Sequence, residues 1–433
     1  MDLNKIIKHM NLNHLSNDTI FGCLLFGISA LIGNYGSICH KPVLIVSKAD
    51  NSNSCYTRLQ RVLANVPSLY KIFYPPFFFS NGYLQLIPFT LECWWMIRFP
   101  LCNFITEFIT LPDGEKIVLD WVNEIPTIES VDFGRSVGCA RPIVIIHHGA
   151  NCHSRDLPGQ IYIREAMKRG WHVCILNRRG HNKALTRPNF NFFGSTDDLR
   201  HVISTHLETN YPSSKLFMVG MSAGSGLIAS YMGQQGHATT YAEPEQQQTP
   251  GYITAAVGVS PGYNIEQCMS ASRLVPPFNK ILMNSTNKNF MIPNKHLFES
   301  DPKYNYEALV NAPDMQTWLD NSYACAGYGS KQAYYDATNP MRFVEYISQP
   351  CLFINAVDDP LCHIHNLYDD QHVFDRGAHG CSVAVTETGS HCSFLELGLA
   401  TNWTERVTFE FFDAVLAELD SGTPNIQCDQ IPK

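Results

Sequence analysis

Short apolar runs separated by longer mixed stretches dominate the chain from residue 106 onward. Runs without internal polar positions are typical of strands buried on both faces of a parallel sheet. They predict strands at 142–149, 171–177, 216–219, 252–260, 351–357 and 382–386. Helices are predicted between them at 160–169, 197–209 and from 227, and a last one at 405–419. This order predicts a mostly parallel, doubly wound α/β sheet.

Two further stretches complete the expected core. The apolar runs 108–111 and 117–122 flank the turn-forming residues Pro112 to Glu115, which predicts a hairpin. Residues 261–348 show helical patches and no strand pattern, so we interpret them as a cap or lid inserted over the strand ends. The core is then divided into 106–260 and 349–420, followed by a tail at 421–433.

The N-terminal region has a different character. Residues 1–40 form a tail in which the stretch from Ile20 to Ile32 is apolar and uncharged, somewhat shorter than the roughly 20 residues that span a bilayer. A single-pass signal anchor, a cleaved signal peptide and a buried or surface-lying helix all fit this pattern. Lys and Arg are similar in number on its two sides, so its orientation is not readable. Residues 41–105 are interpreted as a linker and an aromatic extension, with prolines and Gly82 breaking any long helix at 74–88.

Composition narrows the function classes. The chain of 433 residues is 45% hydrophobic and 16% charged, with a net charge of −8. It has no basic stripe, which argues against a nucleic-acid partner. Its 15 cysteines are scattered without a C-x-x-C pair, so most are expected to be reduced core residues. No obligate protein partner is readable.

The central motif is Gly220 to Gly224, a G-x-S-x-G sequence. It follows the apolar run 216–219 and precedes a helical stretch that begins near residue 227. A strand, this motif and a helix together form the nucleophile elbow, in which a tight turn lifts the serine hydroxyl clear of the backbone. The sequence therefore predicts Ser222 as a nucleophile, whereas a chance match in a Gly/Ser-rich loop is the alternative.

A serine hydroxyl needs a base, and the base needs a carboxylate that fixes its tautomer. On an α/β-hydrolase sheet these groups follow in the order serine, acid, histidine at the ends of different strands. The run 351–357 ends at Asp358 and Asp359, and His391 follows the last predicted strand. We favour Asp359 over Asp358 as the acid, although either can simply form the turn before Pro360.

The negative charge of an acyl-transfer transition state needs two backbone N–H donors. The amide of Ala223 is one, and Ala150 or Asn151, after the strand at 142–149, is expected to supply the other. His147 and His148 are not expected to bind a metal, because adjacent residues at a strand end point to opposite sides and no partner cluster has suitable spacing. We expect neither a metal nor an organic cofactor.

The chain resembles a known family. It is similar to the α/β-hydrolase family that contains bacterial esterases, plant embryogenesis-associated proteins, yeast medium-chain ethyl ester synthases, and animal membrane-anchored monoacylglycerol lipases and medium-chain phospholipases. The similarity lies in several separate stretches in the same order. They are 81–85, 148–151, 177–180, 194–199, 219–226, 327–328, 334–335, 354–360 and 391–396.

The resemblance implies a triad of Ser222, Asp359 and His391, ester substrates with acyl chains, and an N-terminal single-pass anchor in the endoplasmic reticulum or another endomembrane. The chain departs from the family pattern at three places. Ser225 stands where a second glycine is frequent and Tyr83 where histidine is frequent. The turn at 389–393 reads Gly-Ser-His-Cys-Ser, where the family usually has Gly-Gly-His-Leu-Gly. These departures leave the triad in place and put the substrate preference in doubt.

The resulting prediction is a membrane-associated serine carboxyl-ester hydrolase that acts on a lipid ester, such as a monoacylglycerol lipase, a phospholipase or a medium-chain esterase. Two alternatives remain. An acyltransferase would use the same triad and pass the acyl group to an alcohol. A non-catalytic hydrolase fold would only bind lipid.

Overall fold

The computed structural model of the chain describes residues 33, 35–48, 53–99, 102–124, 140–156, 160, 162–241, 251–270, 272–377, 379–397 and 402–421. The apolar stretch from Ile20 to Ile32, in which the sequence predicts an anchor, lies outside these residues. Within them, every helix is too short or too polar to cross a bilayer.

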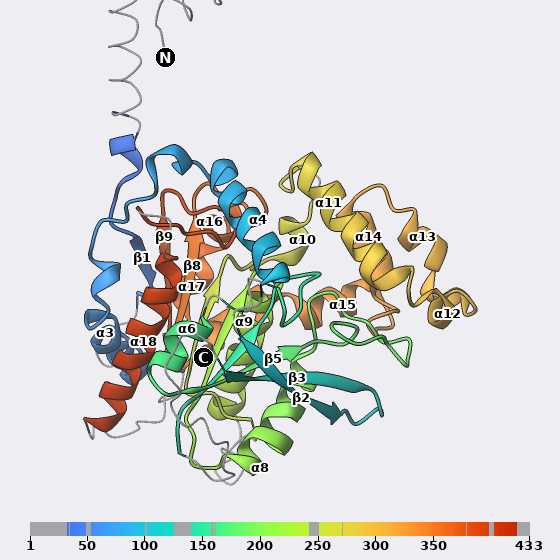
Figure 1. The fold of residues 1–433 in the computed structure, drawn as a ribbon, viewed down its shortest axis with the longest axis horizontal. Helices are drawn as coiled ribbons and strands as arrows, with labels where there is room; N and C mark the ends of the chain where they lie inside the picture. Colours follow the sequence, from blue (N-terminus) through green and yellow to red (C-terminus); the bar gives the residue numbers. More distant parts are fainter. Residues whose placement is uncertain are drawn as a thin grey trace, which may run out of the picture.

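The described strands form one nine-stranded sheet in the order β1-β9-β8-β7-β6-β4-β5-β3-β2 (Figure 1). The six strands β4 to β9 are parallel to one another, whereas β1 and the β2–β3 hairpin are antiparallel edges. The predicted mostly parallel α/β sheet is confirmed. The strands are β1 (Val43–Val46), β2 (Asn103–Thr110), β3 (Lys116–Glu124), β4 (Ile143–His147), β5 (His172–Asn177), β6 (Leu216–Met221), β7 (Ala255–Val259), β8 (Cys351–Ala356) and β9 (Cys381–Thr386).

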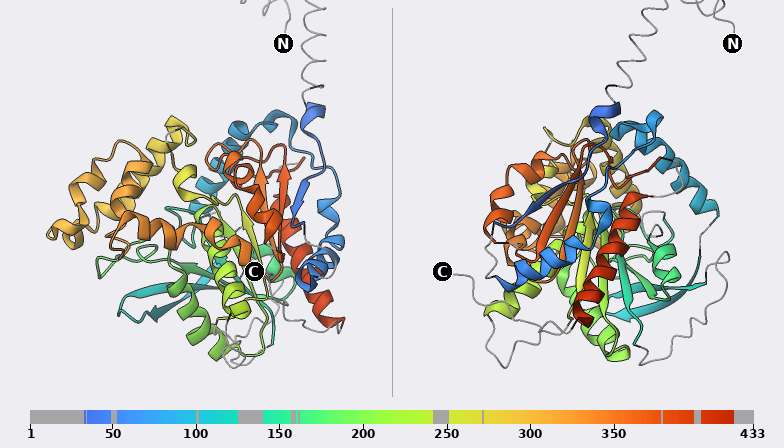
Figure 2. Two further views of the ribbon diagram at one scale, coloured as in Figure 1. Left: turned by 180° about the vertical axis from the view of Figure 1, so that it is seen from behind. Right: turned by 90° about the vertical axis from the view of Figure 1, so that its left-hand side faces the viewer.

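Helices cover both faces of the sheet, because its central strands are apolar on both sides. One face packs against α3 (Ser54–Ala64), α6 (Ile163–Lys168) and α18 (Trp403–Asp420), with η1 (Pro67–Leu69) beside them (Figure 2). The other face packs against α7 (Thr196–Val202), η3 (Ile203–Leu207), α9 (Ala223–Tyr241), α16 (His365–Tyr368) and α17 (Gln371–Arg376). The three-residue helix α8 (Glu208–Asn210) follows η3.

In the described part of 261–348 the regular elements are all helices, joined by turns, and the segment extends to one side of the sheet (Figures 1 and 2). Its aromatic and aliphatic side chains form a third apolar core together with the loop that contains Phe190 to Phe193. Its elements are α10 (Ile265–Cys268), α11 (Pro276–Thr286), η5 (Asn287–Met291), α12 (Lys295–Phe298), η6 (Pro302–Tyr304), α13 (Tyr306–Val310), α14 (Met315–Ser322), α15 (Lys331–Thr338), η7 (Pro340–Arg342) and η8 (Val344–Tyr346). We call this segment the cap.

The prediction that no long helix forms around Gly82 was wrong. After the short η2 (Phe77–Phe79), α4 runs from Gly82 to Arg98 and contains Pro88. Asn81 caps the helix, since its side-chain oxygen accepts hydrogen bonds from the amides of Tyr83 and Leu84. Gly82 starts the helix because it lies against Asp358: a Cβ at this position would be 2.2 Å from the Asp358 carbonyl oxygen. The glycine therefore serves close packing and does not break the helix.

The strand β1 was not expected either. Its four residues pair antiparallel with β9, with Val43 opposite Val385. A run this short inside a stretch interpreted as a linker has no distinctive pattern, and only the exposed edge of β9 makes it a strand. Elsewhere the cysteine prediction holds: eleven described cysteines are free and eight of those are buried, while Cys55 is disulfide-bonded.

Candidate active site

Ser222 sits between β6 and α9 in a strained turn. Its backbone has φ of +53°, a left-handed conformation that is uncommon for a residue with a side chain. Contacts with other backbone atoms explain the flanking glycines. A Cβ on Gly220 would lie 2.6 Å from the Gly224 carbonyl oxygen, and a Cβ on Gly224 would lie 2.4 Å from the His147 carbonyl oxygen. The predicted strand–turn–helix context of the motif is present.

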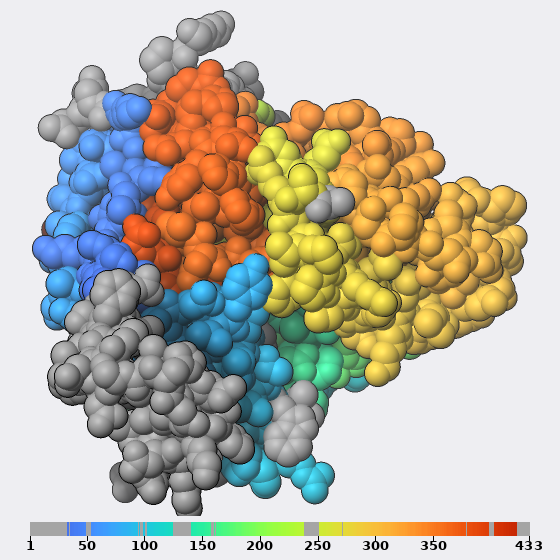
Figure 3. All heavy atoms as spheres, turned by 90° about the horizontal axis from the view of Figure 1, so that it is seen from above, coloured from blue at the N-terminus to red at the C-terminus, as the bar shows by residue number. Residues whose placement is uncertain are grey.

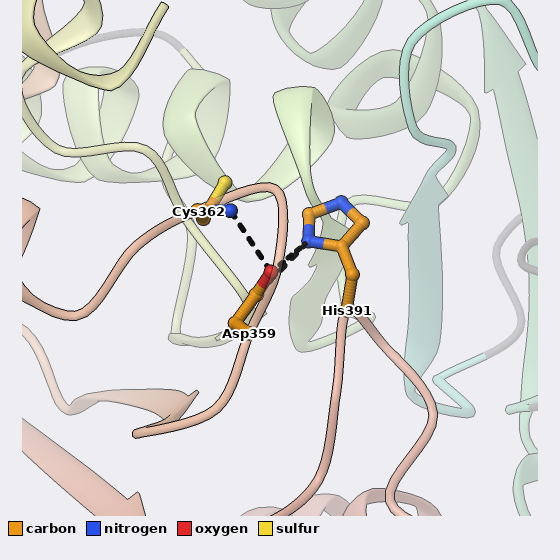
Figure 4. A group of neighbouring side chains, drawn as sticks. All are labelled: Asp359, Cys362 and His391. Atoms are coloured by element: carbon orange, nitrogen blue, oxygen red, sulfur yellow. Dashed lines mark hydrogen bonds and ion pairs between the residues drawn. The ribbon is translucent and has the colours of Figure 1, made fainter. Parts of the chain in front are cut away.

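His391 and Asp359 form a hydrogen-bonded pair at the ends of β9 and β8 (Figure 4). The imidazole Nδ1 lies 2.9 Å from Asp359 Oδ2 and 3.1 Å from Oδ1. Asp359 Oδ1 also accepts hydrogen bonds from the amides of Leu361 and Cys362, at 2.8 and 2.9 Å. The carboxylate side chain is fully buried and the imidazole is largely buried. This arrangement leaves the imidazole Nε2 available for another partner.

Asp358 points elsewhere. Its carboxylate accepts hydrogen bonds from the Thr388 hydroxyl (2.6 Å) and from the amides of Gly389 and Ser390 (3.0 and 3.2 Å). Burial raises the pKa of this carboxyl group. Asp358 therefore braces the loop that carries His391, and Asp359 is the aspartate that contacts the imidazole.

Ser222 and His391 line one cavity of about 250 Å³ between the sheet and the cap, together with Ala150 and Ala223. The rest of its wall is mainly apolar and comes from α9, the 192–197 loop and the cap. Its apolar members include Phe192, Phe193, Leu227, Ile265, Leu274 and Leu282. Ser225, one of the departures from the family pattern, is fully buried and donates a 2.6 Å hydrogen bond to the Ser222 carbonyl oxygen. This hydrogen bond helps to hold the backbone of the elbow in place.

The two predicted positions for the second N–H donor differ. Ala150 lines the cavity. Asn151 has φ of +59° and directs its side-chain amide to the Thr286 hydroxyl at 3.0 Å, which ties it to α11 of the cap. In the part of the chain that the structure describes, the amides of Ala150 and Ala223 donate to no protein acceptor.

Asp359, Cys362 and His391 place a carboxylate, a sulfur and an imidazole nitrogen within 4.8 Å of one another (Figure 4). The chemistry of these atoms does not suit a metal ion. The Asp359 carboxylate already accepts hydrogen bonds from His391 and from the amides of Leu361 and Cys362. The nearest donor nitrogen of His391 is already bonded to Asp359. We therefore treat the group as part of the site around Ser222.

His147 and His148 are fully buried, and burial lowers the pKa of both imidazoles, to about 3 for His147. Both are neutral at pH 7. His148 Nδ1 lies 2.9 Å from the Gly149 carbonyl oxygen, so this nitrogen carries the proton. His147 ends β4 and His148 follows it, and both side chains are buried beneath the turn that carries Ala150.

Arg178, which follows β5, has a structural role that the sequence did not predict. Its guanidinium is buried and donates to the carbonyl oxygens of His148 (3.0 Å) and Gly149 (2.8 Å). The signal was present: the residue directly follows a buried strand at the same edge of the sheet as the other site residues. Charged residues near strand ends usually face solvent, so the sequence alone did not single it out.

The family of the chain follows from its similarity to known proteins. The sequence profile of the serine aminopeptidase S33 family matches residues 138–398, which include Ser222, Asp359 and His391. The chain belongs to this family. The resemblance to α/β-hydrolases described above is thereby confirmed, as is the α/β-hydrolase fold.

Several curated proteins are similar over most of their length. Phospholipase ABHD3 of Bos taurus is 25% identical over 96% of this chain and 97% of its own. Monoacylglycerol lipase ABHD2 of Homo sapiens is 24% identical over 82% of both chains. Protein ABHD15 of Homo sapiens is 23% identical over 73% of this chain and 66% of its own. With the family match, these relatives identify the chain as a serine ester hydrolase.

Two solved structures are similar to part of this chain. The Pyrococcus furiosus esterase Pf2001 is 15% identical and covers 73% of this chain and 91% of its own, with a TM-score of 0.43. The structure of DcsB in complex with its substrate analogue is 14% identical and covers 73% of this chain and 100% of its own, with a TM-score of 0.44.

Proposed function

We propose that this protein hydrolyses carboxyl esters of lipids through an acyl-enzyme, with Ser222, His391 and Asp359 as the catalytic triad. One observation carries the proposal: the buried Asp359–His391 pair and the elbow serine open onto the same mainly apolar cavity. The similar proteins named as a phospholipase and a monoacylglycerol lipase support a lipid substrate.

The chemistry follows from the positions of these groups. Ser222 Oγ attacks the acyl carbonyl carbon while its proton passes to His391 Nε2. The amides of Ala223 and of Ala150 or Asn151 donate to the resulting oxyanion. The alcohol leaves with the proton from His391, and the acyl group stays on Ser222. Water then repeats the sequence and releases the acid. Asp359 holds the imidazole in the required tautomer throughout.

The apolar cavity wall favours an acyl chain over a polar group. Side chains from the cap, such as Ile265, Leu274 and Leu282, line the cavity that contains Ser222. Each methylene transferred from water to such a wall contributes about 0.8 kcal/mol to binding. We therefore assign the cap wall to the acyl chain of the substrate.

We further propose that the protein works at a membrane surface. Helix α4 exposes Leu84, Ile87, Leu91 and Trp95, whose spacing places them on one side of the helix. Their exposed fractions lie between 43% and 62%. Figure 3 shows α4 beside the cap on one face of the molecule. Tyr83 at the start of α4 stacks on Phe278 of α11, with ring centroids 6.2 Å apart.

An exposed apolar stripe of this kind suits the boundary between lipid headgroups and acyl chains. An anchor at residues 20–32 would reach the described chain at residue 33 and would hold the protein near such a surface. The anchor and its location in an endomembrane are part of the proposal.

The decisive test labels the protein with a fluorophosphonate probe, which reacts with activated serines, and assays a panel of lipid esters in detergent. Wild type is expected to be labelled and to release acid from lipid esters, whereas Ser222→Ala does neither. Ser204→Ala is a matched control at a serine of η3, which does not line the cavity, and is expected to keep the label. Labelling that persists in Ser222→Ala, or a wild type without labelling, would refute the proposal. Adding a short alcohol to the assay distinguishes hydrolysis from acyl transfer by the ratio of acid to new ester.

A further inference from the structure

Arg178 is a buried cation, and among the residues that the structure describes it contacts no carboxylate. Its two terminal nitrogens donate to main-chain carbonyl oxygens, Nη1 to His148 and Nη2 to Gly149. None of the ion pairs between described residues involves Arg178. A buried guanidinium usually has a partner of opposite charge. Its presence here, on two successive carbonyls of the turn after β4, calls for an explanation.

The peptide between Gly149 and Ala150 provides one. In a trans peptide the C=O and N–H bonds point in opposite directions from the same plane. The Gly149 carbonyl oxygen accepts hydrogen bonds from Arg178 Nη2 (2.8 Å) and His148 Nδ1 (2.9 Å). Fixing this oxygen on one side fixes the Ala150 N–H on the other side. Ala150 lines the cavity that contains Ser222.

We propose that Arg178 is a positioning residue that sets the Ala150 amide as the second oxyanion donor of the reaction. The inference rests on the proposed esterase function and deepens it by choosing between the two expected donors. Ala150 is chosen over Asn151 because Ala150 lines the cavity, whereas Asn151 does not and ties its side chain to Thr286 of α11.

The positive charge adds to the effect of the hydrogen bonds. A cation that bonds to a carbonyl oxygen draws electron density from the peptide and makes its N–H a stronger donor. At the cavity this charge also favours a developing oxyanion over a neutral carbonyl, because little water screens it. Burial lowers the pKa of the guanidinium to about 10, so it stays charged at pH 7.

The surrounding chain makes room for this side chain. Gly194 has φ of +91°, and a Cβ on it would lie 2.6 Å from Arg178 Cδ. An alanine at this position would displace the arginine stem without removing its charge. Gly194 therefore offers a second, independent way to disturb the contact.

The first test compares Arg178→Met and Arg178→Lys with wild type in steady-state ester hydrolysis. We expect Arg178→Met to lower kcat about 10- to 100-fold, less than the 10²- to 10³-fold typical for loss of a whole donor, with KM changed less than threefold. Arg178→Lys keeps the charge and one hydrogen bond, so its kcat should fall less. Affinity for a trifluoromethyl ketone, which forms an oxyanion on the serine, should fall by the same factor as kcat. Affinity for an unreactive ether analogue of the substrate should stay within threefold of wild type.

Arg179→Met is the matched control. Arg179 is adjacent but pairs with Asp198 and Asp113, away from the turn after β4. Its loss is expected to lower the melting temperature and to leave kcat within threefold of wild type. An Arg178→Met variant with unchanged kcat, or with equal losses of affinity for the ketone and the ether, would overturn the positioning role.

If Arg178→Met does not fold, Gly194→Ala decides. If Gly194→Ala lowers both kcat and the affinity for the trifluoromethyl ketone, the proposal is supported. If its kcat is unchanged, the proposal is rejected. Failure of the esterase proposal looks different, because wild type itself would then show no Ser222-dependent hydrolysis.

Discussion

The sheet side and the cap side of the cavity hold their residues by different means. On the sheet side, glycines bring main-chain atoms into contact, as Gly224 does against the His147 carbonyl, and buried charged groups fix the loops, as Asp358 and Arg178 do. On the cap side, aromatic and aliphatic side chains form a separate core. We therefore expect substitutions on the sheet side to displace main-chain atoms of the site. Substitutions in the cap are expected to be accommodated by repacking of neighbouring side chains. We infer that the chemistry belongs to the first side and substrate selection to the second.

The largest effect is expected at Asp359, the proposed triad acid. Asp359→Asn keeps the shape of the side chain but presents the wrong tautomer to His391, so kcat should fall about 10³- to 10⁴-fold with the fold intact. Asp358→Asn is the matched control, since it can still accept from the amides of Gly389 and Ser390. Its kcat should fall less than about tenfold. Steady-state kinetics with circular dichroism measure both, and a reversed order would assign the acid to Asp358.

The next effect compares two glycines. Gly224→Ala would place a methyl group 2.4 Å from the His147 carbonyl oxygen, so the elbow must shift and activity should fall at least about 10²-fold. Gly329 in the cap has open space around it, so Gly329→Ala should leave activity and melting temperature nearly unchanged. Equal effects of the two substitutions on kcat would contradict the difference between the two sides.

A smaller effect is expected in the cap wall. Leu282 of α11 lines the cavity, and Leu282→Trp would fill part of it. KM for long-chain esters should rise about tenfold, since a few methylenes lose their apolar contacts, while kcat/KM for acetyl esters should change less than threefold. Assays with a series of acyl lengths measure this. A uniform loss for all lengths would show that the cap also orders the chemical groups.

The smallest effect concerns stability alone. Burial, with Glu165 nearby, raises the pKa of Glu405 in α18 to about 7. A carboxyl with a raised folded pKa favours the folded state below its ordinary pKa of about 4.5, and this contribution is lost as the pH rises toward 7. Glu405→Gln should therefore be more stable than wild type at pH 8, by about 1–2 kcal/mol, and no more stable at pH 4. Thermal unfolding at the two pH values measures this, and kcat at pH 8 should not change.

Much of the fold was readable because its signals are local. Buried parallel strands leave short apolar runs, and the run before the elbow became β6 as expected. The failures came where distant segments decide the structure. Residue 82 is a glycine because Asp358 lies against it, and Val43–Val46 is a strand only because β9 has an open edge. Neither contact has a sequence signature.

For the site, the sequence by itself determined the residue types and their order: an elbow serine, two adjacent aspartates and a histidine after the last strand. Only the tertiary structure decided which aspartate contacts His391, since both follow the same strand and differ in the direction of their side chains. It also decided that Arg178 is buried on the turn after β4, because the partners of a charged side chain depend on segments that the fold brings together. Local patterns fix elements, and long-range packing fixes which side chains meet.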